Sequence, residues 1–131
     1  MTGAASTAQA TAKPFAVDLS AWFRATFDRA ALEAAASWKD FGNGSRIGKL
    51  AREGNVGLVV YHIADGAKDD VFGAHTHVGG EMYYVLQGET YDDDGTYPAG
   101  TLVWMRPGSR HLPKTRGETW ILVLWPDGVR A

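Results

Sequence analysis

Residues 75–88 read HTHVGGEMYYVLQG, which combines two histidines, a glycine pair, a glutamate and a run of strand-forming residues. Side chains alternate between the two faces of a β-strand, so His75 and His77 point to the same side. Glu81 keeps this parity across the glycine pair, which lets the backbone bend. Two histidines and a carboxylate on one face are typical metal ligands. We therefore predict that this stretch binds a metal ion.

A third histidine completes the candidate site. His111 follows a separate β-prone run in the sequence RPGSRH, and the chain has only 4 histidines in all. A lone histidine is usually a hydrogen-bonded core residue, but this spacing favours a metal site. Cysteine is absent, so the ligand atoms must be nitrogen and oxygen. We expect one divalent ion per chain, with four ligands: His75, His77, Glu81 and His111.

The chain beyond this stretch is typical of an all-β domain. From residue 37 onward, short β-prone runs alternate with Gly, Asn, Asp and Pro clusters, a pattern that favours a sandwich or barrel. Residues 37–131 are therefore predicted to form one metal-binding domain. The expected strands are 37–40, 46–52, 56–63, 81–86, 90–92, 101–106 and 119–125. Asp92, Asp93 and Asp94 are interpreted as a solvated hairpin turn, because further ligands for calcium are missing.

The N-terminal part differs in composition and in its pattern of apolar residues. Residues 1–17 are rich in Ala, Thr and Ser and are predicted to be a disordered tail, because they can bury little apolar surface. Residues 18–36 place apolar side chains at helical spacing, which predicts a short helical arm capped by Asp18 or Ser20. We expect the aromatic residues of this arm to pack on the core: Trp22, Phe23 and Phe27.

Charge and hydropathy exclude several classes of function. The net charge of −2 and the pI near 6.0 lack the clustered basic residues of a nucleic-acid-binding protein. No apolar run approaches the length of a membrane span, and the N-terminus lacks the features of a secretory signal. We expect a cytoplasmic protein with a small-molecule ligand or substrate, no nucleic-acid partner and no membrane association.

Two short motifs resemble the signatures of the cupin superfamily. The first, H-x-H-x3-E-x6-G, is met in full by His75, His77, Glu81 and Gly88. The second, G-x5-P-x-G-x2-H-x3-N, is met by Gly100, Gly108 and His111, with Arg106 and Thr115 at its proline and asparagine positions. The resemblance extends over residues 37–125. It implies a cupin jelly-roll β-barrel, or double-stranded β-helix, with the metal inside and with pairing of two chains as a homodimer.

Within the superfamily, residues 79–111 are most similar to the ChrR-like branch. That branch includes the C-terminal domain of ChrR-type anti-sigma factors and small dioxygenases such as the acetylacetone-cleaving enzyme. The acetylacetone-cleaving enzyme is described as using histidines without a glutamate, so Glu81 is a departure from it. ChrR-type anti-sigma factors carry an N-terminal zinc domain with cysteines, which we do not expect in this cysteine-free sequence.

Two functions remain open on this basis. The first is an iron(II) dioxygenase that cleaves a C–C bond in a small dicarbonyl or hydroxyketone. The second is a zinc-loaded, non-catalytic sensor or ligand-binding module like the ChrR cupin domain. Ligand affinity alone does not select iron over zinc, and Mn²⁺ or Ni²⁺ would also suit these ligands. The missing cysteine domain favours the enzyme.

Several residues are candidates for the surroundings of the metal. Tyr83 and Val85 share the parity of Glu81 and are expected to line a pocket, with further candidates on later strands: Trp104, Trp120 and Leu122. Aromatic side chains suit an apolar substrate, although ordinary barrel packing would also explain them. His62 could orient a metal ligand, but we favour a strand residue that faces solvent or a subunit interface. Arg106 and Arg110 could attract an anionic substrate or be ordinary surface arginines.

Overall fold

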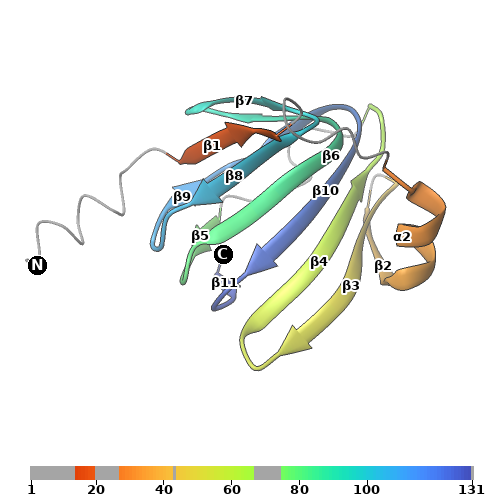
Figure 1. The fold of residues 1–131 in the computed structure, drawn as a ribbon, viewed down its shortest axis with the longest axis horizontal. Coiled ribbons are helices and arrows are strands. Elements are labelled where there is room, and N and C mark those ends of the chain that lie inside the picture. The colour runs from red at the N-terminus through yellow and green to blue at the C-terminus, as the bar shows by residue number, and fades with distance from the viewer. Residues whose placement is uncertain (1–13, 20–26, 43, 67–74, 131) are drawn as a thin grey trace, which may run out of the picture.

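The structure is a computed structural model that describes residues 14–19, 27–42, 44–66 and 75–130. Within these ranges the chain is almost entirely antiparallel β-structure with one short helix (Figure 1). No helix in the described ranges is long and apolar enough to cross a membrane. The elements are β1 (Phe15–Asp18), α2 (Arg29–Ala35), β2 (Ser37–Gly42), β3 (Ser45–Glu53), β4 (Val56–Ile63), β5 (His75–His77), β6 (Glu81–Asp92), β7 (Gly95–Pro98), β8 (Thr101–Met105), β9 (Arg110–His111), β10 (Lys114–Trp125) and β11 (Val129–Arg130).

The strands form two sheets. The larger one has the order β1-β8-β6-β10-β4-β3-β2, with β7 paired to one part of β6, and the smaller one has the order β11-β5-β9. Neighbours in both sheets run antiparallel. β10 lies between β6 and β4 in the larger sheet, although β7, β8 and β9 separate it from β6 along the chain. This topology confirms the all-β prediction for the fold class.

The long central strand β6 differs from the expectation of two separate strands, 81–86 and 90–92. It continues through Gly88, which has a φ of 79° in the left-handed region that favours glycine. A Cβ atom at Gly88 would collide with Thr119 on β10. Gly88 therefore keeps two strands in contact at a position where the sequence predicted a break.

The N-terminal part also differs from the prediction. Residues 15–17, which we expected in a disordered tail, belong to β1, whose backbone pairs with the edge of β8. The described helix in the arm is limited to α2, and its N-cap is Asp28, whose side chain accepts a hydrogen bond from the Ala31 amide at 3.0 Å. Ser20, Trp22 and Phe23 lie outside the described residues.

The core lies on one face of the larger sheet. Alternation along the strands sends every second side chain to this face, where they form a single apolar cluster. The cluster consists of Val59, Tyr83, Val85, Tyr97, Val103, Met105, Ile121 and Val123. The opposite face is covered near α2, where Phe27 and Trp38 pack on the fully buried ring of Trp120. Phe27 thus packs as predicted for an aromatic residue of the arm.

Candidate metal centre

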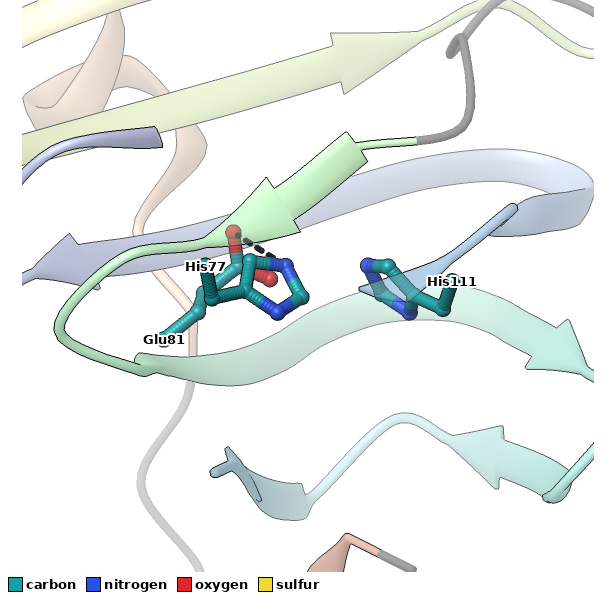
Figure 2. A group of neighbouring side chains, drawn as sticks. All are labelled: His77, Glu81 and His111. Atoms are coloured by element: carbon teal, nitrogen blue, oxygen red, sulfur yellow. Dashed lines mark ion pairs between the residues drawn. The ribbon is translucent and has the colours of Figure 1, made fainter. Parts of the chain in front are cut away.

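Three of the four predicted ligands come together in the structure. The candidate ligand atoms of His77, Glu81 and His111 all lie within 4.8 Å of one another (Figure 2). His77 Nε2 is 3.5 Å from Glu81 Oε2, and the rings of His77 and His111 meet edge to face with centroids 4.6 Å apart. All three residues are buried. Two imidazoles and a carboxylate therefore meet in a site that is shielded from solvent.

A glycine turn between β5 and β6 brings His77 and Glu81 together. Gly80 has a φ of 89°, and its amide donates a hydrogen bond to the His77 carbonyl at 3.4 Å. A Cβ at Gly80 would collide with the ring of Trp104, and one at Gly79 would overlap the side chain of Asp127. The glycine pair thus makes a close turn that no larger residue fits, as the sequence predicted for its backbone.

The fourth predicted ligand, His75, is placed only by its backbone. It lies in β5 directly opposite His111 in β9. Its side chain lies outside what the structure describes. Its role as a ligand therefore stays a prediction.

His77 is held by the loop that precedes β9. Its Nδ1 lies 3.0 Å from Ser109 Oγ. Its backbone amide donates to the Ser109 carbonyl at 3.0 Å, and its carbonyl accepts from the Gly108 amide at 2.6 Å. Because Nδ1 is engaged by the hydroxyl, Nε2 is the ring nitrogen that a metal would take. Sequence analysis missed Ser109, although it lies within the RPGSRH stretch.

His111 is held in the same way by a carboxylate. Its Nδ1 lies 3.1 Å from Asp92 Oδ2, and the Asp92 side chain is only 3% exposed. The other oxygen, Oδ1, accepts hydrogen bonds from the amides of Asp94 and Gly95 at 2.9 and 3.3 Å. Burial alone would raise the pKa of Asp92, but these hydrogen bonds and the charge of His111 lower it below its ordinary value.

This finding corrects the interpretation of the aspartate run as a solvated turn. Asp93 and Asp94 are exposed turn residues, as expected, but Asp92 is buried against His111. The aspartate at the start of a tight turn often accepts backbone hydrogen bonds with its own side chain. That local signal was present in the sequence, whereas the contact with His111 depends on the fold.

Glu81 is the buried carboxylate among the candidate ligands. Burial raises its pKa, while a hydrogen bond from Trp125 Nε1 to Oε2 at 2.6 Å and the charge of His111 act in the opposite direction. Burial likewise raises the pKa values of the neighbouring Tyr61 and Tyr83 hydroxyls, and the charge of Glu81 adds to both shifts. A cation beside Glu81 would favour its ionised form.

Two of the five pocket candidates share the face of the site. Tyr83 and Val85 follow Glu81 on the inner face of β6 and belong to the apolar core cluster. The Tyr83 hydroxyl is 3.1 Å from Thr90 Oγ1. Trp125, at the end of β10, was not among the candidates, although alternation from Ile121 and Val123 places it on this face.

The structure does not bring the other three candidates to the ligands. Trp104 and Leu122 alternate with core residues of β8 and β10, so they lie on the opposite face. Trp104 instead packs against Gly80 of the turn. Trp120 packs on the outer face beneath α2, where it stacks with His62 at a centroid distance of 4.1 Å.

His62, Arg106 and Arg110 do not belong to the group of candidate metal ligands. His62 is partly buried, with Nδ1 contacted by Arg46 Nη2 at 2.9 Å and Nε2 2.8 Å from Glu118 Oε2. It is therefore neither a support for a metal ligand nor a solvent-facing strand residue. Arg106 is partly buried and Arg110 is exposed, on either side of the loop that contains Ser109.

The described residues fit a divalent metal ion. Two imidazole nitrogens and one carboxylate oxygen lie at the separations that a shared ion requires, and each histidine has its Nδ1 engaged by an oxygen. Burial disfavours a lone carboxylate charge at Glu81, so a cation would offset that cost. No second group of this kind occurs in the part of the chain that the structure describes.

The two antiparallel sheets and the buried triad at β5, β6 and β9 define a jelly-roll protein of the cupin class with a candidate metal site. Within that class, the chain belongs to the ChrR cupin-like domain family, whose family model matches residues 28–126. This match confirms both the cupin fold and the resemblance to the ChrR-like branch. The comparison with curated proteins finds no significant match.

Solved structures share this fold. A chain of the Rhodobacter sphaeroides SigE complex with the anti-sigma ChrR is 24% identical, with a TM-score of 0.60, over 69% of this chain and 49% of that one. A putative acetylacetone dioxygenase from Methylibium petroleiphilum is 18% identical, with a TM-score of 0.61, over 79% and 77%. An acetylacetone dioxygenase from Acinetobacter johnsonii is 16% identical, with a TM-score of 0.54, over 67% and 66%. This chain thus spans about half the length of the ChrR-complex chain, and the likeness at these identities concerns the fold.

Proposed function

We propose that the protein is a mononuclear non-haem iron(II) dioxygenase that cleaves a C–C bond in a small dicarbonyl or hydroxyketone. The observation that carries this proposal is the buried group of two histidines and one carboxylate, His77, His111 and Glu81. Two histidines and one carboxylate on one face of a metal are typical of iron(II) oxygenases, and the predicted fourth ligand, His75, would still leave positions open for substrate and oxygen. The likeness in fold to acetylacetone dioxygenases supports the substrate class.

Each described residue of the site would have a distinct role in holding the metal. His77 and His111 would bind through Nε2, because Ser109 and Asp92 engage their Nδ1 atoms and fix the ring orientations. Glu81 would supply the carboxylate, with Trp125 as its hydrogen-bond donor. Iron(II) held there would supply oxygen-dependent redox chemistry, whereas zinc would supply Lewis-acid chemistry or only structural support.

The surroundings of the ligands suit an apolar substrate. Met105 lies opposite Glu81 on β8, and Tyr83 and Val85 follow on the same face of β6. These side chains are buried, so they would limit water near the reacting groups. A small diketone or hydroxyketone has two oxygens to offer a metal and an apolar remainder for such a surface.

The alternative is a zinc-binding, non-catalytic cupin that senses or binds a small ligand. The observation that favours it is the family match, because the family takes its description from ChrR, an anti-sigma factor. In that case the same three side chains would hold zinc, and the hydrogen bonds of the two histidines with Ser109 and Asp92 would serve stability and affinity rather than catalysis. Mn²⁺ and Ni²⁺ remain further possible occupants.

Metal exchange separates the two functions. The protein is stripped with a chelator, reloaded separately with iron(II) and zinc, and followed for oxygen uptake against a panel of β-diketones and hydroxyaryl ketones. The proposal expects uptake with iron only, and its loss in Glu81→Ala and His77→Ala. His62→Ala, away from the site, should keep the activity. No uptake with any ketone, together with micromolar ligand binding to the zinc form, would support the sensor instead.

We further propose a homodimer, as the resemblance to cupins implies. Light scattering on the full chain at micromolar concentration tests this directly. A monomer under these conditions would contradict it.

A further inference from the structure

A groove is lined by residues of β2, β3 and β4. These three strands form one end of the larger sheet (Figure 1). The volume of the groove is about 650 Å³, within the range of sites that bind small molecules. The lining residues come from these three strands, from the β3–β4 turn and from the end of β10. None of the predicted site residues lines it, so it is a separate feature of the molecule.

The floor of the groove is apolar and continuous with the core. Val59 is 5% exposed and belongs to the core cluster, and Ile47 and Trp125 pack against that cluster. Gly57 keeps this surface open to the indole, because a Cβ there would lie 3.2 Å from the Trp125 ring. An apolar body of a ligand could therefore rest on Ile47, Val59 and Trp125.

The walls of the groove carry positive charge only. Lys39, Lys49 and Arg52 line it, and no acidic residue is among the described residues that do so. Lys39 lies opposite Ile47 and Lys49 lies opposite Val59 in their strand pairs, so both lysines share the face of the apolar floor. Arg52 is partly occupied, since its Nε donates to the Gly54 carbonyl at 3.1 Å. This local excess stands out in a chain whose net charge is −2.

We propose that this groove binds a small organic anion with an apolar body. The anionic group would meet Lys39 and Lys49, and the apolar part would lie on Ile47, Val59 and Trp125. Trp125 also joins the groove to the metal centre, because its Nε1 donates to Glu81 at 2.6 Å. The inference depends on the groove alone, so it holds whether the metal centre is catalytic or not.

Binding of anilinonaphthalene sulfonate, an apolar anion that fluoresces in apolar sites, tests the proposal on the full chain. One probe should bind per chain, and phenylbutyrate should displace it. The uncharged phenylbutanol should displace it at least about tenfold less well, because it cannot form ion pairs with Lys39 and Lys49. Lys39→Gln/Lys49→Gln should weaken probe binding by about tenfold. The charge-matched control Lys114→Gln/Arg116→Gln, on β10 away from the groove, should leave it unchanged.

A steric variant tests the location independently of charge. Ala51→Trp fills the groove from its exposed edge and should weaken both the probe and phenylbutyrate, with thermal unfolding used to confirm that each variant folds. Equal displacement by phenylbutyrate and phenylbutanol, or probe binding unaffected by both the double lysine variant and Ala51→Trp, would overturn the proposal. Light scattering should also be recorded with and without the probe. If only the monomer binds the probe and the dimer does not, the proposal is overturned, because a second copy would then occupy the groove.

Discussion

Two histidines in the described part of the chain, His111 and His62, are each paired with a carboxylate, and the two pairs differ in what they can do. His111 and Asp92 form a pair 3.1 Å apart with side chains 4% and 3% exposed. His62 and Glu118 form a pair 2.8 Å apart on the outer face, with side chains 12% and 31% exposed. In both pairs a carboxylate fixes the orientation of an imidazole, so the pairing alone does not identify a metal ligand.

The second ring nitrogen makes the difference. Arg46 donates to Nδ1 of His62 while Glu118 contacts its Nε2, so protein groups engage both nitrogens of that ring. At His111 the carboxylate engages Nδ1, and the ring lies within reach of His77 and Glu81. A histidine is thus a candidate ligand when its carboxylate partner directs the other nitrogen toward further ligands.

The largest expected effect concerns the histidines themselves. His111→Gln removes a ligand nitrogen and should lower metal affinity by more than about 100-fold, beyond the range for loss of an outer hydrogen bond. His62→Gln removes the same kind of side chain from the outer pair and should leave metal affinity unchanged. Competition with a chromophoric chelator measures both. Equal losses in the two variants would contradict the comparison.

Substitution of the two carboxylate partners, Asp92 and Glu118, should also affect metal affinity unequally, but by less than substitution of the histidines. Asp92→Asn keeps the shape of the side chain but weakens its hold on His111, and it should lower metal affinity by about 10–100-fold. The matched change Glu118→Gln should have no such effect, because His62 does not contact the site. Metal content after dialysis against a chelator checks the pair, and full metal retention in Asp92→Asn would count against an orienting role.

The two glutamates should affect the pH dependence of stability with opposite signs. Burial raises the pKa of Glu81, so its contribution to metal-free stability is present below the ordinary glutamate pKa and is lost as pH rises through the raised value. The hydrogen bond from His62 lowers the pKa of Glu118, whose contribution is present above the ordinary value and lost as pH falls through the lowered one.

Two substitutions follow from these signs. Glu81→Gln should raise the thermal stability of the metal-free protein more at pH 8 than at pH 4, because the amide cannot ionise whereas the buried carboxyl does so as pH rises. Glu118→Gln should lower thermal stability slightly at neutral pH. Thermal unfolding of the metal-free proteins from pH 4 to 8 checks both, and a loss of stability in Glu81→Gln would show that the buried carboxylate is better satisfied than its burial indicates.

The smallest expected effect lies at the rim of the outer pair. Arg29 Nη2 is 2.8 Å from Glu118 Oε2, but the arginine side chain is 53% exposed. Arg29→Ala should therefore change the free energy of unfolding by less than about 1 kcal/mol and leave metal affinity unchanged. Urea unfolding measures this, and a loss well above that figure would mean that the contact of Arg29 with the Trp120 ring matters more than the ion pair.

Much of the metal site could be predicted from the sequence because its residues follow local rules. Strand parity and the glycine pair place His77 and Glu81 together, and the second motif supplies His111. Trp125 and Asp92 were missed because their contacts join strands whose alignment is not encoded in any one segment. The short strand β1 was missed for a similar reason, since its pairing with β8 is provided by tertiary structure.

The aromatic side chains on the outer face show why one predicted pocket residue was wrong. Trp120 was a pocket candidate because of its aromatic side chain. In the structure it lies under α2 with Phe27, Trp38 and His62. Its Nε1 is buried without a hydrogen-bond partner among the described residues. The pairing of β10 with β4 is regular, so Trp120 alternates with the core residue Ile121 and faces outward; the sequence did not show which set of alternating side chains faces the core. Next to Trp120, β10 shifts its register against β6, and the extra residue lies on β6.

That shift in register also sets the phase of β6. Glu81 and Asp92 are separated by an odd number of positions, so regular alternation would send them to opposite faces. The pairing with β10 advances by two residues on β6, from Val85 to Gln87, while β10 advances by one, and Tyr83 then meets Thr90 across the same interior. This single extra residue turns Asp92 inward to His111. Deleting Leu86 would make the separation between Glu81 and Asp92 even, so regular alternation without the bulge would still point Asp92 toward His111. Inserting one residue between Thr90 and Tyr91 would instead turn Asp92 away from the histidine while Glu81 stays in place, so the length of β6 is a part of the site that no inspection of its ligands would reveal.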